Sequence, residues 1–193
     1  MIQLGYMDLN GIYARQNFWT KVKAYDVNGT LLFESGSPNH FLFNRTTSVL
    51  KVSEPDKPWL TISNTGGTKM NNVAYEVDQQ GVLRATITVA RFGRYSKNHI
   101  AIRNGEDELL GSVDINAKSI AGYSLADSTY STASVNDVDG KTLATIASKD
   151  RHSKFKIVVH PTYEISDAPP VPEEWEAILI AILILTAVGL IIA

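Results

Sequence analysis

The last seventeen residues of the chain, 177–193, are apolar on every side of a helix. They read AILIAILILTAVGLIIA, and only Thr186 and Gly189 interrupt the aliphatic character. As a helix the segment would be about 26 Å long at about 1.5 Å per residue. A helix without a polar face cannot lie on the surface of a soluble domain. The pattern therefore predicts either a helix enclosed by the rest of the protein or a short membrane span.

The preceding chain alternates strand-like segments with turns. Residues 20–25 alternate in polarity, Asp26-Val27-Asn28-Gly29 is typical of a hairpin turn, and residues 30–33 form the return strand. Units of the same kind recur at 75–89, 100–113 and 133–146. Consecutive hairpins at even spacing favour a sandwich or a barrel.

Proline and glycine mark the breaks in this pattern. Residues 56–59 and 63–69 are expected to be loops because of their proline and glycine content. The last strand, 157–159, ends before His160-Pro161, and the three prolines within 169–173 predict a stiff connector. Acidic residues then occupy the first turn of the terminal helix, where negative charge suits the helix dipole; these are Glu173, Glu174 and Glu176.

The combined pattern predicts an all-β fold with one helix. A helix about 10 Å across would fill a barrel of about a dozen strands. We therefore expect a closed antiparallel β-barrel of about 12 strands around a central C-terminal hydrophobic α-helix. The whole chain, 1–193, would be a single domain, with the hairpin barrel at 1–168, the connector at 169–173 and the helix at 174–193.

Hairpin repeats followed by the run EWEAILIAILIL resemble the tubby-like superfamily, which includes tubby C-terminal domains, LURP-one-related proteins and phospholipid scramblases. The likeness covers about residues 21–193 and implies a closed barrel around a helix from the chain end. The cysteine cluster, the proline-rich N-terminal tail and the acidic calcium-loop pattern of scramblases are absent from this sequence. The chain is most similar to the loosely defined LURP-one-like proteins of prokaryotic type.

Composition narrows the classes of function. The 18 basic and 20 acidic residues nearly balance, so nucleic-acid binding is not expected. The chain has no cysteine, which excludes disulfides, thiolate metal sites and a cysteine nucleophile. The first ten residues, MIQLGYMDLN, lack the pattern of a secretory signal, so a cytoplasmic protein is expected.

Candidate catalytic and metal-binding residues have simpler interpretations. The histidines lie far apart in the sequence and favour surface or turn positions over a metal site or catalytic triad; they are His40, His99, His152 and His160. Residues 106–108 are acidic but fall in a hairpin turn, and Asp137-x-Asp139-Gly140 lacks the further ligands of a calcium loop. We expect no enzyme activity, no metal and no cofactor.

Two basic clusters, interleaved with aromatic residues, are the main charge feature. Their cations are Arg84, Arg91, Arg94, Lys97, Lys149, Arg151, Lys154 and Lys156. Such clusters can hold anionic headgroups at about 1 kcal/mol per cation, although a solvated barrel face would also carry them. In tubby domains a basic barrel face binds phosphoinositides, so the resemblance implies the same class of ligand here.

The sequence thus predicts a non-enzymatic binding or membrane-surface tethering module. Its partner would be an anionic phospholipid or a protein, and the protein would be cytoplasmic and peripheral to a membrane. The alternative is a tail-anchored membrane protein with a cytosolic β-domain and a C-terminal transmembrane helix. The seventeen uncharged residues are fewer than the roughly 20 that a span usually needs.

Overall fold

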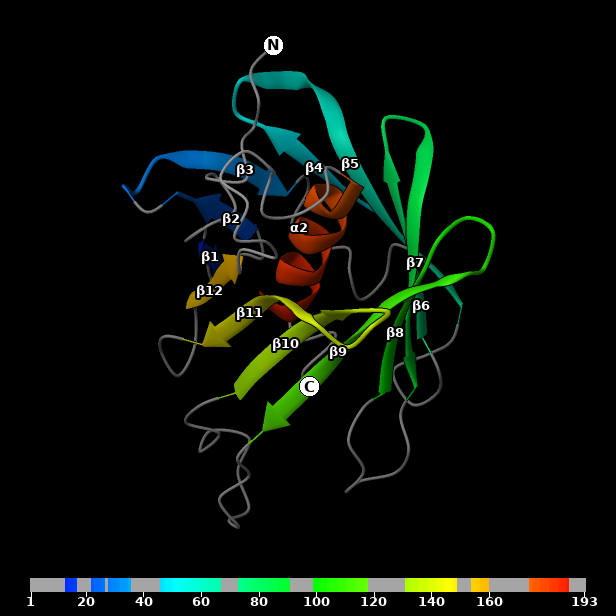
Figure 1. Cartoon of the computed structure of the whole chain (residues 1–193). Coiled ribbons are helices and arrows are strands. Elements are labelled where there is room, and N and C mark those ends of the chain that lie inside the picture. Colours follow the sequence, from blue (N-terminus) through cyan, green and yellow to red (C-terminus); the bar gives the residue numbers. More distant parts are fainter. Residues whose placement is uncertain are drawn as a thin grey trace, which may run out of the picture.

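The computed structural model describes residues 13–16, 22–26, 28–35, 46–66, 73–90, 99–117, 131–148, 154–159 and 174–187. These residues form twelve β-strands followed by the helix α2 (Figure 1). The strands are β1 Tyr13–Gln16, β2 Val22–Tyr25, β3 Leu31–Ser35, β4 Thr46–Lys51, β5 Glu54–Gly66, β6 Val73–Gln79, β7 Val82–Ala90, β8 His99–Arg103, β9 Leu109–Ala117, β10 Ser131–Asp137, β11 Thr142–Ser148 and β12 Lys154–Val159. The helix spans Glu174–Ala187.

Every strand pairs antiparallel with its neighbours in sequence. The hydrogen-bonded order is β1-β12-β11-β10-β9-β8-β7-β6-β5-β4-β3-β2. Strand β1, the first in this order, pairs with β12 beside it and also with β2, the last; Ala14 lies opposite Phe155 of β12 and opposite Ala24 of β2. The order of pairing therefore returns to its starting strand.

Alternating polarity gives strands such as β6 and β7 one buried and one outer face. On β6, Val73, Tyr75 and Val77 are buried, while the residues between them are at least partly exposed. Tyr75 lies opposite Ile87 of β7, which is also buried. Directly opposed residues point to the same face of a sheet, so the register joins the apolar positions of the strands into one inner surface.

Helix α2 lies against this inner surface. From Trp175 to Thr186 every side chain is buried except that of Glu176, which is half-buried. The helix contacts β1 and β12 on one side and β6 and β7 on the other (Figure 1). These two pairs are half the strand order apart, so the helix lies between opposite parts of the sheet. For the residues that the structure describes, the prediction of a mostly β, antiparallel fold with one helix is confirmed.

The described helix covers residues 174–187 of the range expected from the sequence. It was expected over 174–193, but residues 188–193 lie outside the described part of the chain. No helix within the described residues is long and apolar enough to cross a membrane. The Thr186 hydroxyl is buried and has no hydrogen-bond partner among the described residues. Such a group costs roughly 1–3 kcal/mol, so apolar burial must stabilise this end of the helix.

The expectation of loops at 56–59 and 63–69 was wrong for most of those residues. Strand β5 runs from Glu54 to Gly66; residues 67–69 lie outside the described part. Pro58 is tolerated because it opposes Leu50, where the register between β4 and β5 shifts on both sides. Trp59 then enters the core and stacks on Phe33, with 4.8 Å between the ring centroids. Its burial outweighs the local turn signals.

Gly111 on β9 allows the first turn of the helix to pack against the sheet. A β-carbon at this position would lie 2.1 Å from the Asn136 carbonyl oxygen and 3.1 Å from the Trp175 ring. The carbonyl belongs to the backbone of β10, which pairs with β9 at this point. A larger residue would therefore push against a neighbouring strand and the helix together.

Replacing Gly111 with alanine should destabilise the protein by roughly 1–3 kcal/mol, the usual cost of overpacking a core. Gly66→Ala is the matched control, because nothing lies within 4 Å of its added β-carbon. Urea unfolding of the two variants and the parent measures the difference. Equal unfolding midpoints for both variants would show that β10 and Trp175 do not approach Gly111 as closely as described.

A charge in the middle of the helix should prevent stable folding. Leu183 is fully buried, and an unpaired ammonium there costs several kcal/mol, a large part of the roughly 5–15 kcal/mol that holds a domain folded. We expect Leu183→Lys to be unfolded or aggregated in detergent-free buffer, whereas Leu183→Met folds normally. Circular dichroism during heating distinguishes the two. A tail-anchored protein would instead keep a normally melting β-domain in the lysine variant.

Candidate functional site

The connections between strands fall at two ends of the sheet. Because neighbouring strands are antiparallel, successive connections alternate between the ends. We call one the hairpin end; its connections are residues 26–30, 52–53, 80–81, 104–108 and 138–141. We call the other the basic end; it joins strands through residues 17–21, 36–45, 67–72, 91–98, 118–130 and 149–153.

The two sets of connections carry opposite charge. Those of the basic end contain nine basic residues and two acidic ones, Asp127 and Asp150. Those of the hairpin end contain five acidic residues and one basic residue, Lys141. The net charge of the whole chain is therefore close to zero although the connections at its two ends have opposite charge. An anion would be attracted to the basic end.

The predicted basic residues divide between these ends. Arg91, Arg94 and Lys97 belong to the connection between β7 and β8, and Lys149 and Arg151 belong to the one between β11 and β12. All five lie outside the described residues, but both connections join strands at the basic end. The two clusters thus share an end of the sheet, with four strands between them.

Arg84 does not share that end. It lies near the start of β7, beside the β6–β7 turn, and its Nε donates a hydrogen bond to the Gln79 side-chain oxygen at 2.8 Å. Ala90, the last residue of β7 and the neighbour of Arg91 in sequence, lies six residues further along the strand, roughly 20 Å away at about 3.3 Å per residue. Residues close in sequence on one strand are here at opposite ends of the sheet.

Lys154 and Lys156 lie on β12. The register of Lys154 places it in a row of basic residues across three strands, which the sequence analysis did not include. Lys154 is opposite Arg15 of β1, and Arg15 is in turn opposite Lys23 of β2. The Lys23 side chain is on the outer surface, between the buried Val22 and Ala24. Lys23 also pairs with Glu34, with 3.5 Å between Nζ and the carboxylate oxygen. Only knowledge of which strands pair could bring Arg15 and Lys154 together.

The hairpin end is built by a repeated polar turn. In three hairpins the first turn residue accepts two backbone N–H groups through its side-chain oxygen, from positions two and four residues later, at 2.8–3.0 Å. These residues are Asp26, Asn104 and Asp137. Asp and Asn commonly make such turns, and positive φ falls on the fourth residue of each. That residue is Gly29, Asp107 or Gly140.

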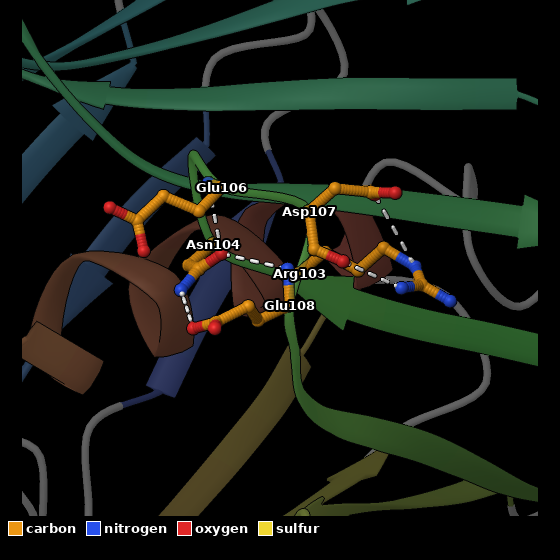
Figure 2. Close-up of polar contacts among 5 residues, drawn as sticks. All are labelled: Arg103, Asn104, Glu106, Asp107 and Glu108. Carbon is orange, nitrogen blue, oxygen red and sulfur yellow. Dashed lines mark hydrogen bonds and ion pairs between the residues drawn. The ribbon is translucent and has the colours of Figure 1, made fainter.

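The β8–β9 turn departs from its sequence pattern. The left-handed conformation falls on Asp107, with φ of 65°, although Gly105 lies in the same turn. Arg103 supports this strained residue by donating from Nη1 to the Asp107 carbonyl at 2.8 Å (Figure 2). Its Nε lies 3.7 Å from the Asp107 carboxylate. The Asn104 amide donates to Glu108 at 2.9 Å, so this turn is held by side chains.

Acidic residues of the hairpin end do not form a metal site within the described residues, where no three His, Cys, Asp or Glu side chains gather. The side-chain oxygens of Asp137 and Asn104 accept hydrogen bonds from backbone N–H groups, so these two residues have a structural role in their turns. The hairpin end therefore carries mostly negative charge, whereas the basic end carries the cations that an anionic ligand would need.

Asp26 should make part of the stability depend on pH. The N–H of Thr30, followed by that of Asn28, stabilises the ionised carboxylate and lowers the pKa of Asp26. A lowered folded-state pKa gives stability that is complete above the unfolded value of about 3.9 and is lost as pH falls through the folded value. Asp26→Asn should remove this dependence while keeping the turn, as Asn104 does. Urea unfolding at about pH 6 and about pH 3 measures it.

The control for this measurement is Asp139→Asn, an exposed acid of the equivalent β10–β11 turn whose position does not accept the two backbone bonds. It should keep the parental pH dependence. If Asp26→Asn and Asp139→Asn change the pH profile equally, the Thr30 and Asn28 bonds do not favour the ionised form.

Comparison with known proteins supports the fold. No protein-family model and no curated protein matches the sequence. The structure is similar to the X-ray structure of a protein from Arabidopsis thaliana, with a TM-score of 0.54 and 16% sequence identity. The similarity covers 95% of this chain and 94% of the Arabidopsis chain, so the two share a fold over nearly their whole lengths.

Proposed function

We propose that the protein is a non-enzymatic module that binds an anionic surface, such as phospholipid headgroups, through its basic end. The observation that carries this proposal is the charge of the connections at that end, nine basic residues against two acidic ones. Each cation close to an anionic membrane contributes about 1 kcal/mol, so several together give useful affinity. A cytoplasmic protein with this property would be peripheral to a membrane.

The cross-strand row of Lys23, Arg15 and Lys154 supports anion binding at the same end, the basic end. Each of the three lies near the basic-end limit of its strand. Like charges directly opposite each other destabilise a sheet, by roughly 0.2–1 kcal/mol per pair. Glu34 pairs with Lys23 and offsets part of this cost. An anion bound along the row would relieve the repulsion, which gives the row a function beyond solvation.

The proposal includes the finer architecture, a closed barrel of twelve strands around the C-terminal helix. It is supported by the pairing of β1 with both β2 and β12 and by the contacts of α2 with strands on opposite sides. This arrangement is what the resemblance to tubby-like and LURP-one-related proteins implies. The same resemblance favours phosphoinositides among anionic lipids.

Two alternatives make different predictions. In a tail-anchored protein α2 would lie in a membrane, away from the sheet; its burial against β1, β12, β6 and β7 supports enclosure instead. In a protein that merely solvates its charges, the basic end would have no preferred ligand. Vesicle binding separates this second alternative from the proposal.

Neutralising four cations at the basic end should abolish binding to anionic vesicles. The variant carries Arg91→Gln, Arg94→Gln, Arg151→Gln and Lys154→Gln. At about 1 kcal/mol per cation the loss is roughly 4 kcal/mol, or about a thousandfold in affinity. Binding of the parent should also weaken with salt, because the Debye length falls from about 10 Å at 0.1 M to about 3 Å at 1 M. Co-sedimentation with phosphatidylserine–phosphatidylcholine vesicles measures both effects.

The matched control removes the same number of charges from the hairpin end, by Lys57→Gln, Arg84→Gln, Arg103→Gln and Lys141→Gln. Its net charge equals that of the test variant, so a difference between them reports the location of the charges. Equal loss of binding in both variants, or equal pelleting of the parent with neutral and anionic vesicles, would contradict the proposal.

A further inference from the structure

The hairpin end exposes apolar side chains that the outer wall of the sheet does not. All the large hydrophobic residues that are exposed within the described part lie in or beside its turns. They are Val52, Val82, Leu83, Leu109 and Val138, between 39% and 62% exposed. By contrast, the outer wall of β7 presents Thr86 and Thr88 between its buried residues. The described apolar exposure is therefore concentrated at one end.

Three of the hairpins bring these side chains onto neighbouring elements. The β6–β7 and β8–β9 hairpins touch, because a Leu83 methyl carbon lies 3.7 Å from where a Gly105 β-carbon would be. The β10–β11 turn adjoins them, since Asp137 pairs with Gly111, two residues after Leu109. Apolar patches of this kind, bordered by polar residues, often mark interaction surfaces.

Charge identifies what this surface would accept. The Glu106 carboxylate points away from the other labelled side chains and has no hydrogen bond or ion pair among the described residues (Figure 2). The Asp107 side chain is 88% exposed, and Asp139 is exposed on the next turn. An occupant should therefore combine cations with apolar or aromatic groups.

The chain itself contains such a segment in a connection at the basic end. Residues 91–98 read RFGRYSKN, with three cations, two aromatic residues and no acid. Arginine and aromatic residues are enriched at protein interfaces. The segment joins β7 to β8 at the basic end, so it cannot reach the hairpin end of its own molecule without crossing the length of β7, roughly 30 Å.

We propose that the hairpin end binds residues 91–98 of a second copy of this chain. Such a contact joins two different surfaces, so it leaves one hairpin end and one basic end open on each pair. Head-to-tail contacts of this type form open chains unless the rotation closes a ring. This association uses Arg91 and Arg94, which also serve the proposed lipid function, and it is tested without lipid.

A charge exchange between the two surfaces tests the contact. One variant carries Glu106→Lys and Asp139→Lys at the hairpin end; the other carries Arg91→Glu and Arg94→Glu at the basic end. Sedimentation velocity over a range of concentrations at low salt should show self-association of the parent, at least a tenfold weaker association of each variant, and association restored in their equimolar mixture. In the mixture the unaltered hairpin end of one variant meets the unaltered basic end of the other, beside the exchanged pair, so restoration shows that the two ends bind each other.

Two controls keep the outcome specific. Glu76→Lys reverses an exposed charge on the outer wall and should associate like the parent, whereas Leu109→Ser should weaken association through the apolar contact alone. Thermal unfolding verifies that each variant is folded. A parent that stays monomeric, a mixture that is not restored, or an equal loss in Glu76→Lys would overturn the proposal. The hairpin-end variant should still bind anionic vesicles, so failure here is distinguishable from failure of the lipid proposal.

Discussion

The need to keep water away from every side of α2 governs this structure. Its described residues are aliphatic almost throughout, and no rotation of such a helix gives it a polar face. A single sheet face or one neighbouring helix would leave part of it in water. Contacts with β1 and β12 on one side and β6 and β7 on the other solve this problem. The sheet needs the helix in return, because its inner face is equally apolar.

Enclosure of the helix has a consequence for where ligands can act. The inner side chains of the strands and those of α2 form one hydrophobic cluster, including Val77, Ile87 and Ile182. The polar groups that vary along the chain are therefore on the outer wall and at the two ends. The outer wall of strands such as β7 is made of small polar residues. The exposed large apolar side chains of the described residues lie in or beside the connections at the hairpin end, and most of the unbalanced charge lies in the connections at the two ends.

The sequence was sufficient for features that local chemistry determines. Alternating polarity gave the strands, Asp–x–x–Gly patterns gave the turns at Asp26 and Asp137, and an uncharged run gave the helix. Strand β5 was missed because Pro58 and Trp59 look like a loop, and only the bulge opposite Leu50 and the stacking on Phe33 explain their place in the sheet. Local rules fail where tertiary packing supplies the stabilisation.

The candidate site could be predicted only in part, for a reason of topology. A cluster of cations along the sequence suggested one face, yet Arg84 and Arg91 are separated by the length of β7. Conversely, Arg15 and Lys154 are distant in sequence but directly opposed in register. In a meander of antiparallel strands, whether two charges meet depends on how many strands separate them. Every second connection shares an end, so a chain with a net charge of −2 can keep a basic end and an acidic end apart. The same alternation fixes the direction in which the protein would face an anionic surface, with the acidic hairpins turned away from it.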